Sequence, residues 1–215
     1  MKPIIFVRIS SMKYYKGTTN DTPENGGSYV TETGDAHECY NFDAVDFEDG
    51  TSQCLGFTML TGKRRNEAQI KIENIVGCDA LKKEETASAV TVVWCAKARN
   101  SQNMRVVGFY KNATVYRRSQ YVEFDTGYVQ EFKFIADKKD CVLIPLNKRF
   151  SDNRWYVPTS GKNNSSFGFG RSSIWYGGSH TDDQKEIEYV ERMIDSIENY
   201  DGENWIDERG DNNGF

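Results

Sequence analysis

The sequence has few of the residues from which most catalytic and metal sites are built. It contains two histidines, so a histidine-based nucleophilic triad depends chiefly on His37. The five cysteines are an odd number and include no C-x-x-C pair, which argues against a disulfide framework and against a zinc site. The carboxylates show no spacing typical of a two-metal nuclease. We therefore expect neither a metal ion nor another cofactor.

A long hydrophobic run is also missing. The apolar stretch that begins at Ile4 is broken by Arg8, which makes it too short for the core of a signal peptide and far too short to span a bilayer. We therefore expect a cytoplasmic protein with reduced thiols and no membrane partner.

Acidic residues are unevenly distributed along the chain. Residues 181–215 hold twelve acidic residues against three basic ones, a net charge of −9, which leaves +4 for the first 180 residues. A mildly basic body is compatible with nucleic acid on one face, although an ordinary solvated surface explains so small an excess about as well. We expect a nucleic-acid-reading domain over residues 1–180 and an acidic helix and tail over residues 181–215.

Most of the first 180 residues are typical of short strands separated by turns. β-branched or alternating segments predict strands over residues 4–9, 40–47, 54–60, 89–96, 104–110, 113–116, 128–135 and 141–146. Curvature of such a sheet into a barrel would remove its open edges. The expected fold class is α+β, with a curved β-barrel of antiparallel or mixed strands and peripheral helices.

The C-terminal part predicts an amphipathic helix over residues 182–200. Thr181 and Gln184 resemble a capping box, and apolar residues recur behind them at helical spacing. A shorter helix is expected over 75–81, and the acidic end over 203–215 is expected to be loose apart from Trp205.

The stretch from Val106 to Arg117 is the most informative part of the sequence, because it combines aromatic, amide and cationic residues around an expected bend. Two aromatic rings can hold a base that has left its duplex, and each stacked base contributes about 1–3 kcal/mol. Buried aromatics in β proteins are usually core, so this alternative stays open for each ring. The predicted base pocket consists of Trp94, Phe109, Tyr110, Asn112, Tyr116, Trp175 and Tyr176.

Several polar residues could meet phosphates or base edges. Asn112 can read a base edge or occupy a left-handed turn, and Lys111 before it and Arg117 after it could meet phosphates. The glycine-rich bend before Arg171, Ser172 and Ser173 could expose backbone N–H groups to a phosphate or could be a plain loop, and it contains no Walker motif. His37 could contact a ligand, act in catalysis or make a structural hydrogen bond.

Five short motifs in fixed order resemble a family of bacterial domains. They are residues Met12–Gly17, Gly26–Tyr29, His37–Glu38 with Asn41–Phe42, Gly108–Arg117 and Ser172–Tyr176. The pattern is similar to N-terminal domains fused to HNH-type and related restriction endonucleases, within the PUA-like group that includes the EVE, YTH and SRA modified-base readers. This sequence differs from it at Ser11, where the pattern has an aromatic residue, and at Phe109, where it has a tryptophan.

The resemblance implies a curved β-barrel with a pocket for a flipped, modified base. Phe109, Tyr110, Asn112 and Tyr116 would line or support this pocket, with Trp175 and Tyr176 near it. Residues of the first motif, Met12, Lys13 and Tyr14, would contact phosphates or base edges together with His37, Lys111, Arg117, Arg171, Ser172 and Ser173.

The expected function is therefore binding of nucleic acid as the sensor module of a restriction or defence system. DNA with a modified base is favoured, and cleavage would need a separate nuclease subunit. Structured RNA or a small nucleotide is an alternative ligand for the same pocket. A nuclease or hydrolase that uses His37 with a carboxylate such as Glu38 is the enzymatic alternative. An interaction module that docks through its acidic helix is the third alternative.

Overall fold

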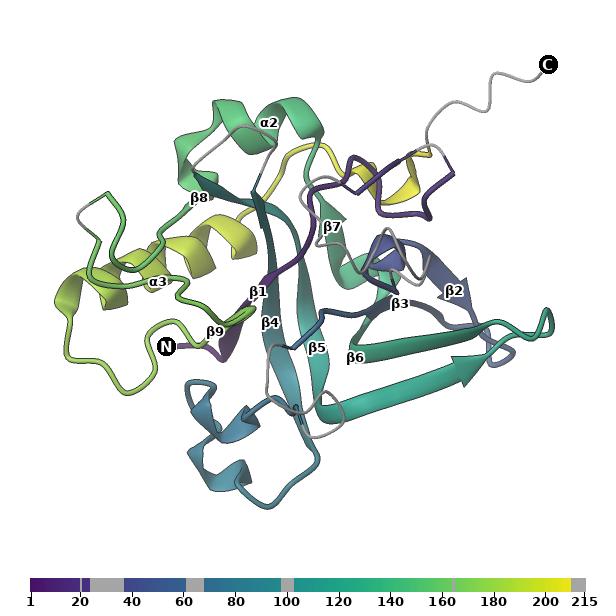
Figure 1. Ribbon diagram of the computed structural model, residues 1–215, viewed down its shortest axis with the longest axis horizontal. Helices are drawn as coiled ribbons and strands as arrows, with labels where there is room; N and C mark the ends of the chain where they lie inside the picture. Colours follow the sequence, from purple (N-terminus) through teal and green to yellow (C-terminus); the bar gives the residue numbers. More distant parts are fainter. Residues whose placement is uncertain (20, 24–36, 61–67, 98–102, 164, 210–215) are drawn as a thin grey trace.

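The structure is a mixed α+β fold organised around one bent sheet. The computed structural model describes residues 1–19, 21–23, 37–60, 68–97, 103–163 and 165–209 (Figure 1). Nine strands are present in this part of the chain: β1 (Ile4–Arg8), β2 (Ala44–Asp46), β3 (Ser52–Gly56), β4 (Thr86–Lys97), β5 (Met104–Glu123), β6 (Val129–Asp137), β7 (Cys141–Leu143), β8 (Tyr156–Val157) and β9 (Ile174–Trp175).

The strands follow the order β2-β3-β6-β5-β4-β1-β9, and β7 and β8 both pair with β5. The β1–β4 pair is parallel and the other pairs are antiparallel. The first part of β5 pairs with β7 and β8, whereas its later part pairs with β6, so the sheet forks along β5. Among the described strands the terminal ones, β2 and β9, do not pair, and the expected closure into a barrel is wrong. β2 and β9 are therefore open edges of the sheet.

A single long strand replaces two of the expected ones. β5 runs through both 104–110 and 113–116, and its register against β4 shifts between Tyr110 and Ala113. Asn112 lies at this irregularity with φ of +50°, a left-handed conformation that asparagine tolerates better than most residues. The alternative in which Asn112 occupies a left-handed position is thus confirmed.

The sheet has a hydrophobic core on each face, because successive side chains of a strand point in opposite directions. Trp94, Tyr110 and Phe134 belong to one core. Phe109 and Trp155 belong to the other, which also includes residues of a C-terminal helix. Adjacent residues of β5 therefore contribute to different cores.

Helix α3 (Gln184–Glu198) lies against the second core, through buried Val190, Met193 and Ile197. The expected helix over 182–200 is confirmed, with a start two residues later. Its cap is the Asp183 side chain, which accepts a hydrogen bond from the Lys185 backbone N–H. The other α-helix in the described part of the chain is short, α2 (Leu146–Ser151).

Several 3₁₀ turns connect these elements: η1 (His37–Tyr40), η3 (Ile72–Asn74), η4 (Asp79–Leu81), η5 (Lys138–Asp140), η6 (Asn153–Trp155) and η7 (Trp205–Asp207). The helix expected over 75–81 does not form; the two short 3₁₀ turns η3 and η4 lie before and after Ile75. The expectation of a loose end is wrong for residues 203–209, because the Asn204 side chain accepts from Leu143 N and donates to the Cys141 carbonyl. The remaining residues of that expectation, 210–215, lie outside the described part.

The structure also bears on the exclusions made from composition. All five cysteines are buried free thiols. Among the described residues no three or more metal-ligating side chains are grouped closely enough to hold an ion. None of the helices in the described ranges has both the length and the apolar character needed to cross a bilayer.

Candidate ligand-binding cavity

Three of the aromatic residues expected in a base pocket are core residues. Trp94, Phe109 and Tyr110 each have an exposed fraction of 0%. Trp94 packs edge-on against Tyr110 with ring centroids 5.2 Å apart, and the Tyr110 hydroxyl donates to the Asn41 carbonyl. Burial raises the pKa of Tyr110 well above its ordinary value. Phe109 lies in the core on the other face of the sheet, so these three rings do not line one cavity together.

The other three aromatics are half-buried and lie in different places. Tyr116 packs edge-on against Phe132. Trp175 stacks on Phe6 with centroids 4.4 Å apart. The Tyr176 hydroxyl accepts from the Lys71 backbone N–H, and burial raises its pKa to about 12.

Arg117 is a structural clamp. Its guanidinium is buried, pairs with Glu73 Oε2 at 2.8 Å and donates to the carbonyls of Glu84, Leu81 and Lys82. These bonds fix the segment that contains η3 and η4 against β5. The donors of Arg117 are therefore committed to the protein and are not directed at a phosphate.

The remaining predicted contact residues are dispersed. Arg171 and Ser172 are exposed and Ser173 is buried, with its hydroxyl donating to the Met59 carbonyl. The carbonyls of Met12 and Lys13 accept from the Arg149 guanidinium. Lys111 is partly buried, with its ammonium 5.8 Å from the Phe109 ring, and the ring of Tyr14 is stacked on Trp205. Asn112, expected in the base pocket, is exposed.

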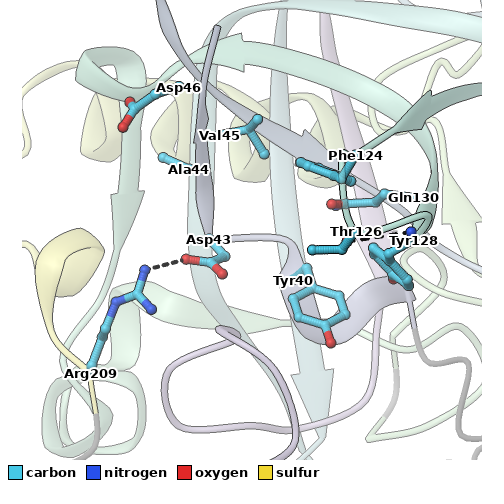
Figure 2. A pocket seen from close by; sticks show the side chains of 10 residues that line it. All are labelled: Tyr40, Asp43, Ala44, Val45, Asp46, Phe124, Thr126, Tyr128, Gln130 and Arg209. Carbon is cyan, nitrogen blue, oxygen red and sulfur yellow. Dashed lines mark hydrogen bonds and ion pairs between the residues drawn. The ribbon is translucent and has the colours of Figure 1, made fainter.

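A cavity does occur elsewhere, at the end of the sheet formed by β2 and the β5–β6 turn. Its volume is about 440 Å³, and Figure 2 shows its lining. Ten residues line it: Tyr40, Asp43, Ala44, Val45, Asp46, Phe124, Thr126, Tyr128, Gln130 and Arg209. Three rings, from Tyr40, Phe124 and Tyr128, gather on one side, and an ion pair of Asp43 with Arg209 lies on the other.

The aromatic side of this cavity follows from a tight turn. Gly127 N–H donates to the Phe124 carbonyl at 2.8 Å, and Phe124 N–H donates to the Tyr128 carbonyl at 2.9 Å. Gly127 has φ of +78°, a backbone conformation in which a residue with a side chain would be strained. The turn brings the rings of Phe124 and Tyr128 into a stacked arrangement with centroids 6.0 Å apart.

His37 supports the aromatic side from behind. Its Nδ1 lies 3.3 Å from the Tyr128 hydroxyl and 3.4 Å from the Glu131 backbone N–H, which donates to it. Its ring packs edge-on against Phe57. His37 therefore helps to hold Tyr128 in the orientation seen here.

Glu38 has a different environment, although it follows His37 directly. Its Oε1 accepts from the backbone N–H and the hydroxyl of Ser10, while burial raises the pKa of this carboxyl. The two neighbours thus have separate hydrogen-bond partners, and His37 and Glu38 do not pair in the described structure.

Polar groups complete the cavity. Gln130 is 3% exposed, and its Nε2 donates to the Leu55 carbonyl while Oε1 has no partner among the described residues. Arg209 Nη2 donates to Asp43 Oδ1 at 2.8 Å. A lining of three rings, one amide and a carboxylate can stack a flat ligand and accept hydrogen bonds from its edge.

Sequence reasoning predicted none of the ten lining residues as part of a site, including Tyr40, Phe124, Tyr128 and Gln130. The available signal was one aromatic residue on each side of Asp125-Thr126-Gly127, namely Phe124 and Tyr128. A tight turn places its flanking residues next to each other. Comparisons with family models, curated proteins and solved structures gave no match to this chain, so its geometry and the motifs quoted above are the basis for a function.

Proposed function

We propose that this chain is a nucleic-acid-binding module that holds a flipped, modified base in the cavity between Tyr40, Phe124 and Tyr128. DNA is the favoured nucleic acid, and the module acts as the sensor of a restriction or defence system whose nuclease is a separate subunit. A PUA-like origin and a cytoplasmic location belong to the same proposal.

One observation carries the proposal: three aromatic rings and the Gln130 amide line a cavity of about 440 Å³. Pockets for small ligands commonly measure about 300–1,000 Å³ and combine aromatic walls with a few polar groups. A base taken out of a duplex needs a stacking surface and a partner for its edge. Tyr128 supplies the first and Gln130 Oε1 supplies the second.

The direct test is fluorescence polarisation with DNA duplexes that differ in one modified base. The protein is expected to prefer the modified duplex, and Tyr128→Ala is expected to weaken this binding by about tenfold to a hundredfold, since one stacked base is worth about 1–3 kcal/mol. Gln130→Met keeps the side-chain length and removes the amide, so it should reduce the preference between duplexes more than the affinity itself.

Tyr121→Ala provides the matched control. Tyr121 is 65% exposed, lies in β5 within the same β5–β6 hairpin and does not line the cavity. Equal affinity for all duplexes, or an equal loss of affinity in Tyr121→Ala and Tyr128→Ala, would refute the proposed site.

A further inference from the structure

The charges that face the cavity bear on which base it accepts, an inference that rests on the function proposed above. Asp43 Oδ1 bonds to Arg209, while its Oδ2 has no hydrogen-bond partner within the described ranges. Figure 2 shows this carboxylate between the Arg209 guanidinium and the Tyr40 ring. The cavity thus contains a carboxylate oxygen that is open to a ligand.

The cation of this ion pair offsets the carboxylate incompletely. The Arg209 side chain is 68% exposed, whereas that of Asp43 is 27% exposed, so water and salt screen the arginine more effectively. Asp46 adds a second carboxylate to the lining, and Arg209 is the one basic residue among the ten. The net charge of the lining residues is therefore negative.

The aromatic side of the cavity also favours a positively charged ligand. The faces of Tyr40, Phe124 and Tyr128 carry the negative part of the ring quadrupole, which attracts cations placed over them. A cationic ring stacked here would gain attraction from the rings and from Asp43 Oδ2 together. A phosphate would be repelled by the same groups, which keeps the nucleic-acid backbone outside the cavity.

We propose that the cavity selects bases that carry a fixed positive charge because they are alkylated on a ring nitrogen. The informative comparison is between isomers, such as 1-methyladenine, which is cationic at neutral pH, and N6-methyladenine, which is neutral. The two have the same heavy atoms and one methyl group each, so they differ mainly in charge and in the position of that methyl. About a tenfold preference for the cationic isomer is expected, equivalent to about 1.4 kcal/mol.

The experiment measures binding of two single-stranded oligonucleotides that carry one of these isomers at the same position. Single strands are used because methylation at the ring nitrogen blocks base pairing and would change the cost of flipping in a duplex. Asp43→Asn removes the charge and keeps the shape, so the preference should fall to about twofold or less. Asp49→Asn is the matched control, since Asp49 lies in the turn before β3 and bonds to Thr51 outside the cavity.

The outcomes separate this inference from the proposed function. A preference for the cationic isomer that is lost in Asp43→Asn and kept in Asp49→Asn supports it. Equal affinity for the isomers, or a preference that survives Asp43→Asn, overturns it. If binding in either of these cases still depends on Tyr128, the proposed function stands. Binding that is unaffected by Tyr128→Ala overturns both.

Discussion

The centre of β5 and the turn at its far end contain similar aromatic residues with different roles. At the centre, Phe109 and Tyr110 are completely buried on opposite faces of the sheet. At the turn, Phe124 and Tyr128 are stacked side by side and line an open cavity. The comparison shows that an aromatic residue in the middle of a central strand stabilises the core, whereas one beside the turn that ends this strand can line a cavity.

The largest expected effect comes from the core side of this comparison. Tyr110→Ala should lower the free energy of unfolding by about 3–5 kcal/mol, because it leaves a cavity between Trp94 and Phe42 and removes a bond to Asn41. Denaturant unfolding measures this loss. The affinity of the folded molecules for modified DNA should stay unchanged. A loss of binding in the folded fraction would indicate that Tyr110 belongs to the binding site.

Arg117 gives the next largest effect, again on stability. Arg117→Met should cost about 2–3 kcal/mol, because the carbonyls of Leu81 and Glu84 lose the donor of a partly buried hydrogen bond and Glu73 loses its ion-pair partner. Denaturant unfolding measures this cost. The dependence of binding on salt concentration should not change. A shallower salt dependence would instead identify Arg117 as a phosphate contact.

On the turn side, the effect should be on binding and not on folding. Tyr128→Ala should weaken binding tenfold to a hundredfold, as above, while the free energy of unfolding falls by about 1 kcal/mol or less, since its ring lines the cavity and not the core. Polarisation and denaturant unfolding on the same sample separate the two effects. A stability loss as large as that of Tyr110→Ala would remove the distinction between the two regions.

His37 should show a smaller effect of the same kind. His37→Phe keeps a ring against Phe57 but removes the acceptor for the Tyr128 hydroxyl and the Glu131 N–H. Binding should weaken by about threefold to tenfold, equivalent to about 0.5–1.5 kcal/mol for a lost hydrogen bond. Turnover of nucleic acid by the wild type that His37→Phe abolishes would favour the hydrolase alternative instead.

The smallest effect concerns Glu38 and appears in the pH dependence of stability. Burial raises the pKa of Glu38 in the folded protein, so the folded state holds its proton more tightly than the unfolded chain does. Stability from this group is therefore greatest below the unfolded pKa of about 4.3 and declines as pH rises towards the higher folded pKa.

Glu38→Gln should remove that decline, which thermal unfolding across the acidic range measures, and should leave binding unchanged. A change in ligand affinity in Glu38→Gln would place this carboxyl in the site after all.

The sequence by itself determined the local elements of this protein. β-branched runs gave β1 and β4 within a few residues, and the apolar spacing gave α3, because these patterns depend on the period of a strand or helix and on nothing distant. It also indicated that Asn112 could occupy a left-handed position.

Only the tertiary structure decided which aromatics are exposed. The local sequence around Phe109 and Tyr110 does not show whether other residues cover them. The neighbours that pack against them, β7, Trp155 and Phe42, come from distant parts of the chain. The cavity likewise joins Tyr40, Tyr128 and Arg209, which are far apart in sequence. Pairing of β2 with β3, β3 with β6 and the return of the C-terminal segment to Asp43 bring them together, and those long-range contacts carry no local signature.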